Sequence, residues 1–149
     1  ADMQHSMATA RRALSRRFLR QVARKLRRTP IRTGEDSDGL SDREDQIIGR
    51  AAIRMLLPTL SVFPETTTLF SWIILRNTNR YGTSPVTLLG LVYWSLSLST
   101  RTGESRTFRR IRRLSRSIVD TLTTDTGRWS PDTAMAVVYS EIHLETRYG

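Results

Sequence analysis

Residues 86–122 read VTLLGLVYWSLSLSTRTGESRTFRRIRRLSRSIVDTL, and the spacing of the apolar side chains changes within this stretch. Over residues 93–100, Trp94, Leu96 and Leu98 alternate with serines, a period of two that is typical of a half-buried strand. After the polar break at residues 102–104, the apolar side chains recur at helical spacing. They are Phe108, Ile111, Leu114, Ile118, Val119 and Leu122. The stretch therefore predicts a strand followed by a helix with one apolar face.

The opposite face of this predicted helix consists of arginines. They are Arg106, Arg109, Arg110, Arg112, Arg113 and Arg116. Between residues 101 and 116 the only acid is Glu104, so these like charges repel one another without compensation on their own helix. A solvated charged face is the usual fate of such a run, but the missing acids favour a surface that binds a polyanion.

Residues 7–28 predict a second basic helix, amphipathic in the same way. Its apolar stripe consists of Leu14, Phe18, Leu19, Val22 and Leu26. Its basic residues are Arg16, Arg17, Arg20, Arg24, Lys25, Arg27 and Arg28. This pattern fits an interfacial membrane helix, a nucleic-acid-binding arm or a mitochondrial presequence, and it also fits a docked surface helix whose arginines are only solvated.

The charge of the whole chain points to the same kind of partner. The 149 residues carry a formal net charge of +10, and Lys25 is the sole lysine. Arginine's planar fork suits bidentate contacts with phosphates. The expected partners are nucleic acid or nucleoprotein and an anionic membrane surface, bound peripherally, because no apolar run approaches the roughly 20 residues of a membrane span.

The remaining segments predict the connections and the rest of the core. Residues 30–40 form an acidic linker with Glu35, Asp36 and Asp38. Residues 41–44 form a capping box that opens a helix, whose buried face is Ile47, Ile48, Ala51, Ala52, Met55 and Leu56. Residues 66–76 and 134–147 are read as strands, with helices beginning at Pro64 and Pro131 as the alternatives.

The predicted fold class is therefore α+β. A small antiparallel sheet with two or three helices packed on it follows the basic N-terminal helix, and an all-α bundle is the alternative. The predicted organisation is a basic helix or arm at 1–29, an acidic linker at 30–40 and one globular domain at 41–149.

Little in the sequence suggests catalysis. The two histidines, His5 and His143, stand far apart and in no metal-ligand or triad spacing. The chain has no cysteine, which removes disulfides and thiolate chemistry. We expect a non-enzymatic protein without cofactor or metal.

A basic N-terminal region is followed by a small domain, in which a strand runs from Trp94 through Arg101 into a polar turn that begins at Thr102 and leads to the helix at Phe108. This order of elements resembles that of the matrix proteins of rhabdoviruses and other negative-strand RNA viruses. The resemblance implies a structural protein of the virion that binds nucleoprotein and the inner face of the envelope and self-associates as a homo-oligomer. It places the protein in the virion or inside the host cell; mitochondrial or nuclear targeting through the arginine-rich N-terminus is the alternative. No Pro-Pro-x-Tyr or Pro-Thr/Ser-Ala-Pro motif occurs, so recruitment of budding factors is not implied. An RNA-binding capsid or accessory protein with sequence-nonspecific, backbone-directed binding is the alternative function.

Overall fold

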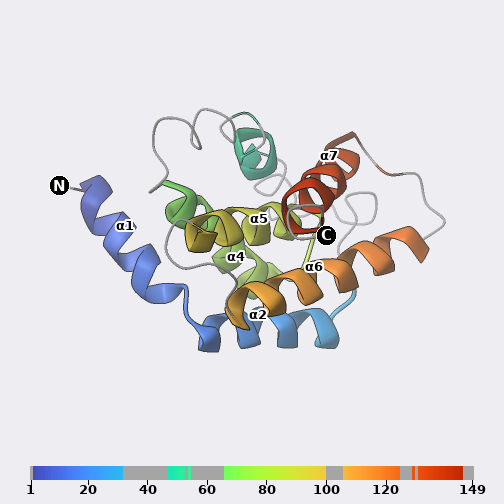
Figure 1. Cartoon of the computed structure of the whole chain (residues 1–149), viewed down its shortest axis with the longest axis horizontal. Coiled ribbons are helices and arrows are strands. Elements are labelled where there is room, and N and C mark those ends of the chain that lie inside the picture. The colour runs from blue at the N-terminus through green and yellow to red at the C-terminus, as the bar shows by residue number, and fades with distance from the viewer. Residues whose placement is uncertain are drawn as a thin grey trace.

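The computed structural model describes residues 2–31, 47–52, 54, 66–99, 106–124, 129 and 131–145 (Figure 1). Throughout these residues the regular elements are helical. They are α1 (Asp2–Ala13), α2 (Arg16–Arg28), a helical segment at 47–52, α4 (Thr66–Tyr81), α5 (Val86–Ser99), α6 (Arg106–Thr124), α7 (Pro131–Ser140) and the π-helical turn η1 (Glu141–Glu145). The capping box at 41–44, almost all of the acidic linker and the polar break at 102–104 lie outside the described residues.

The α+β prediction is wrong, and the alternative of an all-α bundle is right: no strand occurs in the described part of the chain. The alternation at residues 93–99 lies within α5, which is surrounded by other helices. Leu88, Leu89, Leu91, Val92 and Trp94 are all buried, so α5 has no solvent-facing side to produce a helical period.

The alternating serines fit inside this buried helix because they satisfy their own hydroxyl groups. The Ser95 hydroxyl donates to the carbonyl of Val92 at 2.7 Å, and the Ser97 hydroxyl donates to that of Trp94 at 2.7 Å. Such local bonds to the preceding turn let a serine occupy an apolar position without an unpaired donor. A pattern that resembles a strand is therefore compatible with a helix in the core.

The other two predicted strands are also helices. Residues 66–76 belong to α4, which buries Thr67, Ser71, Ile74, Leu75 and Thr78 at helical spacing. Most of residues 134–145 belong to α7 and η1, and α7 begins at Pro131, where the fixed backbone angle of proline favours a first helical turn. The helix start weighed for Pro131 is therefore confirmed.

Helices α4 and α5 form a tight antiparallel hairpin at the centre of the molecule. Gly82 ends α4 with a φ of 107°, a conformation that favours glycine, and its N–H donates to the carbonyl of Thr78 at 2.8 Å. Along the hairpin, the Ser71 hydroxyl donates to the carbonyl of Gly90 at 2.8 Å. A Cβ atom at Gly90 would lie 2.8 Å from Ile74 Cγ2, so glycine permits this close approach.

The segment at 47–52 is joined to α5 by Tyr93. Its hydroxyl donates to the carbonyl of Ala52, and the ring stacks on Phe70 with centroids 5.4 Å apart. Burial raises the pKa of Tyr93, with the nearby Tyr139 adding to the effect, so the phenol stays protonated as a donor. Of the face predicted to be buried, Ala52 is buried and Ile48 is half-buried, whereas Ile47 is 67% exposed and Ala51 is also exposed, so the prediction is wrong for these two residues. Met55 and Leu56 lie outside the described residues.

The predicted single helix at 7–28 is two helices. The helical conformation is interrupted at Leu14 and Ser15. Ser15 is the N-cap of α2, and its hydroxyl accepts a hydrogen bond from the backbone N–H of Phe18 at 3.2 Å. Both helices then pack on the hairpin: α1 and α2 contact α4, and α2 also contacts α6. The segment predicted as an N-terminal arm thus shares the core of the remaining helices.

Candidate polyanion-binding face

The apolar stripe of α2 faces inward. Leu19 and Val22 are 2% and 1% exposed and belong to the core cluster. Leu14, Phe18 and Leu26 are partly buried and pack against that cluster. The Phe18 ring also lies 6.3 Å from the ring of Trp94 in α5. The residues predicted as a membrane or partner stripe are therefore occupied by contacts within this molecule.

Because the stripe faces inward, the arginines of α2 face solvent. Arg16, Arg17, Arg20, Arg24, Arg27 and Arg28 are all exposed, whereas Lys25 is half-buried. Gln21, also exposed, accepts from the amide of Asn79 in α4 at 3.4 Å and so marks the side of α2 that borders α4.

Helix α6 is arranged in the same way. Its predicted apolar face is confirmed, since Phe108, Ile111, Leu114, Ile118 and Leu122 are buried and Val119 packs against them. Arg106, Arg109, Arg110, Arg113 and Arg116 are exposed, and Arg112 is half-buried.

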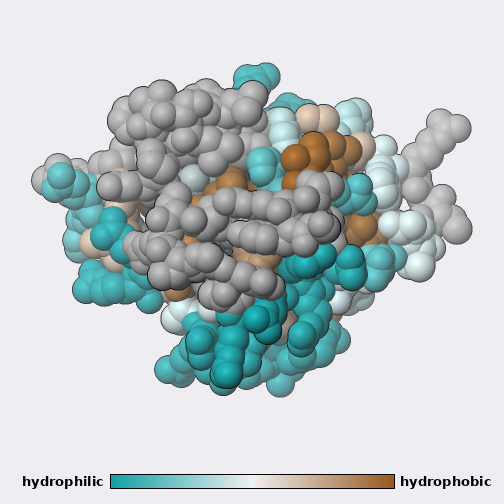
Figure 2. All heavy atoms as spheres, in the orientation of Figure 1, coloured by the Kyte–Doolittle hydropathy of each residue, from teal (hydrophilic) through white to brown (hydrophobic). Residues whose placement is uncertain are grey.

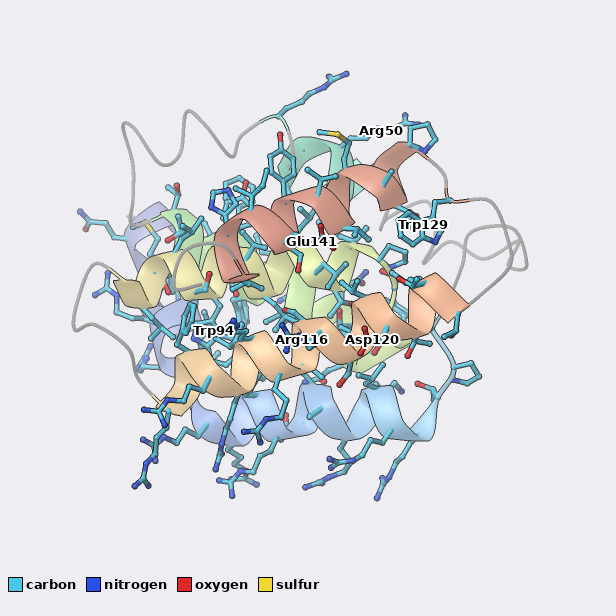
Figure 3. All side chains as sticks on the ribbon, turned by 45° about the vertical axis from the view of Figure 1, so that its right-hand side comes forward. Arg50, Trp94, Arg116, Asp120, Trp129 and Glu141 are labelled. Atoms are coloured by element: carbon cyan, nitrogen blue, oxygen red, sulfur yellow. The ribbon has the colours of Figure 1, made fainter. Side chains whose placement is uncertain are left out.

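Helices α2 and α6 lie side by side and run in the same direction (Figures 1 and 3). Figure 3 shows the long side chains of α2 and of the first half of α6 extending to the same side of the molecule. Figure 2 shows hydrophilic surface over α2 in this region. Two basic segments that are about 90 residues apart in the sequence therefore form one surface. We call it the basic face and define it as the exposed arginines of α2 and α6.

Two further features strengthen the positive potential of this face. Neither α2 nor α6 has an acidic residue in its first turn, so the positive ends of both helix dipoles are uncompensated from within their own helices. The two amino ends also lie toward the same end of the molecule (Figure 1). On α6 the first acid is Asp120, one turn beyond Arg116, and it marks where the arginine run ends (Figure 3).

Two further arginines, Arg11 and Arg12, are not among the residues predicted to form the site. Both are exposed in the last turn of α1, directly before the break that leads into α2. Their chain distance from Arg16 and Arg17 places them beside the amino end of the basic face. The signal that could have identified them is the continuity of the arginine run across Ser15, whose role as an N-cap keeps the two helices adjacent.

Two other types of site find no support in the described residues. These residues contain no group of histidine, aspartate and glutamate side chains that could hold a metal ion. No helix among them combines the length and apolar character needed to cross a membrane. Comparisons with protein-family models, with curated proteins and with solved structures found no match to this chain.

Proposed function

We propose that this protein is a non-enzymatic assembly protein that binds the phosphate backbone of nucleic acid through the basic face. The observation that carries the proposal is the adjacency of α2 and α6, which joins two arginine-rich helices into one surface. Arginines on both helices can contact phosphates along the same strand or duplex, and such contacts release counterions and supply sequence-independent affinity.

The burial of the α2 stripe favours nucleic acid over a membrane-inserted state. An interfacial helix binds by burying its apolar face at the acyl boundary. For α2 this would require Leu19 and Val22 to leave the core, where they are 2% and 1% exposed. An anionic membrane can therefore attract the folded protein by charge, but α2 has no free apolar face with which to enter it.

The composition of the basic face favours contacts to the backbone rather than to bases. Among the described residues, the large hydrophobic side chains that are exposed lie outside α2 and α6. Phe18 and Phe108, the aromatic residues of these two helices, pack against or within the core. Base stacking on an aromatic platform is a major source of affinity for single strands, and this face instead offers guanidinium groups.

The viral matrix-like role remains part of this proposal only through its general elements, which are polyanion binding and self-association. The strand on which the resemblance rests forms helix over residues 94–99, within α5. The support for the proposed function is therefore the basic face and not the order of elements.

Parallel titrations of an RNA duplex and of anionic liposomes at several salt concentrations test the proposal. We expect the protein to bind the duplex with an association constant that falls as salt is added. The logarithm of this constant should fall linearly with the logarithm of the salt concentration, with a slope of several units. We expect weaker liposome binding that is abolished by moderate salt, since no apolar insertion sustains it. Liposome binding that resists salt, together with salt-insensitive or absent RNA binding, would contradict the proposal.

A further inference from the structure

Helix α7 and the turn η1 have apolar side chains on two sides. On the inner side Ala136, Val137 and Leu144 are buried, and α7 packs against α5. On the outer side Met135, Val138 and Ile142 are 39%, 46% and 50% exposed. Their spacing of three and then four residues aligns them along one side of the helix. We call these three side chains the α7 ridge.

The charge around the α7 ridge differs from that of the rest of the molecule. Residues 131–145 contain no lysine or arginine, and Glu141 is exposed beside the ridge. Helices α1, α2, α4 and α6 each carry exposed arginines, as does the segment at 47–52. Helix α5 lacks charge but is largely buried. Of the exposed helices described, α7 with η1 is therefore the one whose own residues place no arginine opposite another when two copies of a +10 chain meet.

The position of the ridge leaves the basic face free. Helix α7 lies on the opposite side of the α4–α5 hairpin from α2 (Figures 1 and 3). Figure 2 shows hydrophobic surface over α7, away from the hydrophilic surface over α2. A contact through α7 would therefore not compete with a polyanion bound to the basic face.

We propose that the α7 ridge is the self-association surface, where a second copy of this chain docks its own Met135, Val138 and Ile142 in a two-fold contact. The ridge itself is uncharged and apolar, so two copies are self-complementary, as an isologous contact requires. The resulting dimer carries its two basic faces on outer surfaces and bridges two segments of polyanion. This bridging role rests on the proposed function, whereas the dimer contact does not.

The small size of the α7 ridge limits the affinity of the contact between two copies. Three half-exposed side chains cover much less than the roughly 800 Å² per partner of a standard interface. The contact is therefore weak between free molecules and becomes populated when several copies are held on one polyanion, because the tether raises their effective concentration. Self-association and bridging thus increase together with the occupancy of the polyanion.

Sedimentation equilibrium of the full chain, at moderate salt and up to its solubility limit, measures the free dimer. We expect Val138→Glu to lower the association constant about tenfold or more, because it places like charges opposite each other in the contact. Tyr81→Glu is the matched control, since Tyr81 is also an exposed large side chain, at 41%, but lies at the end of α4. This control should leave the association constant unchanged.

Disulfide trapping gives a second readout that does not require a dimer populated at equilibrium, because the covalent product accumulates from a transient contact. The chain has no cysteine, so Val138→Cys creates a single thiol near the proposed two-fold axis. Under mild oxidation at moderate salt, Val138→Cys should form a covalent dimer several-fold faster than Tyr81→Cys. Addition of RNA duplex should widen the difference.

Three results would overturn the ridge as a self-association surface. The first is equal trapping rates for the two cysteine variants. The second is a dimer that survives Val138→Glu with its association constant unchanged. The third is a monomeric parent, with and without duplex, in which Val138→Glu lowers the melting temperature sharply, since another part of the same chain would then cover the ridge. Failure of RNA binding alone would remove the bridging role but not the dimer contact.

Discussion

Helices α5 and α6 follow one another in the chain and contact each other, yet only the sequence of α6 shows apolar residues at helical spacing. Helix α6 has a buried apolar side and a solvent side covered with arginine, so its apolar residues recur at helical spacing. Helix α5 is buried at every position from Thr87 to Leu96, and its apolar residues therefore show no helical period. The comparison teaches that apolar residues recur at helical spacing only where one side of a helix faces the core and the other faces solvent. The buried part of α5 has no solvent-facing side, so its sequence lacks this signal.

The largest effect should follow from truncation in α5. Leu91 is fully buried, so Leu91→Ala removes apolar contacts and leaves a cavity, at a cost of about 2–5 kcal/mol in the free energy of unfolding. Chemical denaturation monitored by circular dichroism measures this cost. A loss below about 1 kcal/mol would show that α5 is not the centre of the core and would remove the contrast with α6.

A smaller but more specific effect is expected at Gly90. A Cβ atom there would lie 2.8 Å from Ile74 Cγ2 and 2.9 Å from Leu75 Cδ2. We expect Gly90→Ala to destabilise the fold by about 1–3 kcal/mol through overpacking, although alanine is the better helix former. Denaturant unfolding is again the measurement, and an increase in stability would mean that α4 and α5 are farther apart than these distances indicate.

Tyr93→Phe should cost about 1 kcal/mol, because it removes a buried hydrogen bond to the Ala52 carbonyl. The raised pKa of Tyr93 also predicts that the free energy of unfolding depends on pH. Burial raises its pKa above the ordinary value of about 10, so its contribution is fully present below about pH 10 and is lost as the pH rises further. Unfolding free energies measured between pH 8 and pH 11 should therefore fall less steeply in Tyr93→Phe than in the parent. Identical slopes would contradict this placement of Tyr93.

The smallest effect on stability is expected on the solvent side of α6. Arg106→Gln with Arg110→Gln changes two exposed side chains and should alter the free energy of unfolding by about 0.5 kcal/mol or less. Thermal and chemical denaturation check this value. A loss comparable to that of Leu91→Ala would mean that these arginines hold the fold together and are not a surface available to a partner.

These differences explain which parts of the fold could be predicted from the sequence. Helix α6 and its buried residues could be predicted because one side of the helix faces water. Residues 93–99 could not, because their serines bond to the preceding turn and imitate the polar side of a strand. Pro131 gave the better signal for α7, since the position of a helix start does not depend on which sides of the helix are buried.

The candidate site could be predicted in part for a similar reason. Each arginine-rich helix is a local feature of the sequence, and both arginine runs were identified from it. Their adjacency depends on how α2 and α6 pack around the hairpin, which is a long-range property. The inward orientation of Leu19 and Val22 depends on the same packing, so the sequence alone left the membrane and nucleic-acid interpretations of α2 open.

The central claim, that α2 and α6 form one basic face, is tested most directly by three matched arginine pairs. Each pair is exposed, spaced four residues apart and changed to glutamine: Arg20 with Arg24 on α2, Arg106 with Arg110 on α6, and Arg50 with Arg54 as the control outside both helices. The measurement is the salt dependence of binding to one RNA duplex. The α2 and α6 pairs should each reduce the magnitude of the slope by about 1–2, and the control pair should leave it unchanged. Equal reductions for all three pairs would show that binding follows net charge alone, and the basic face would then not be the site.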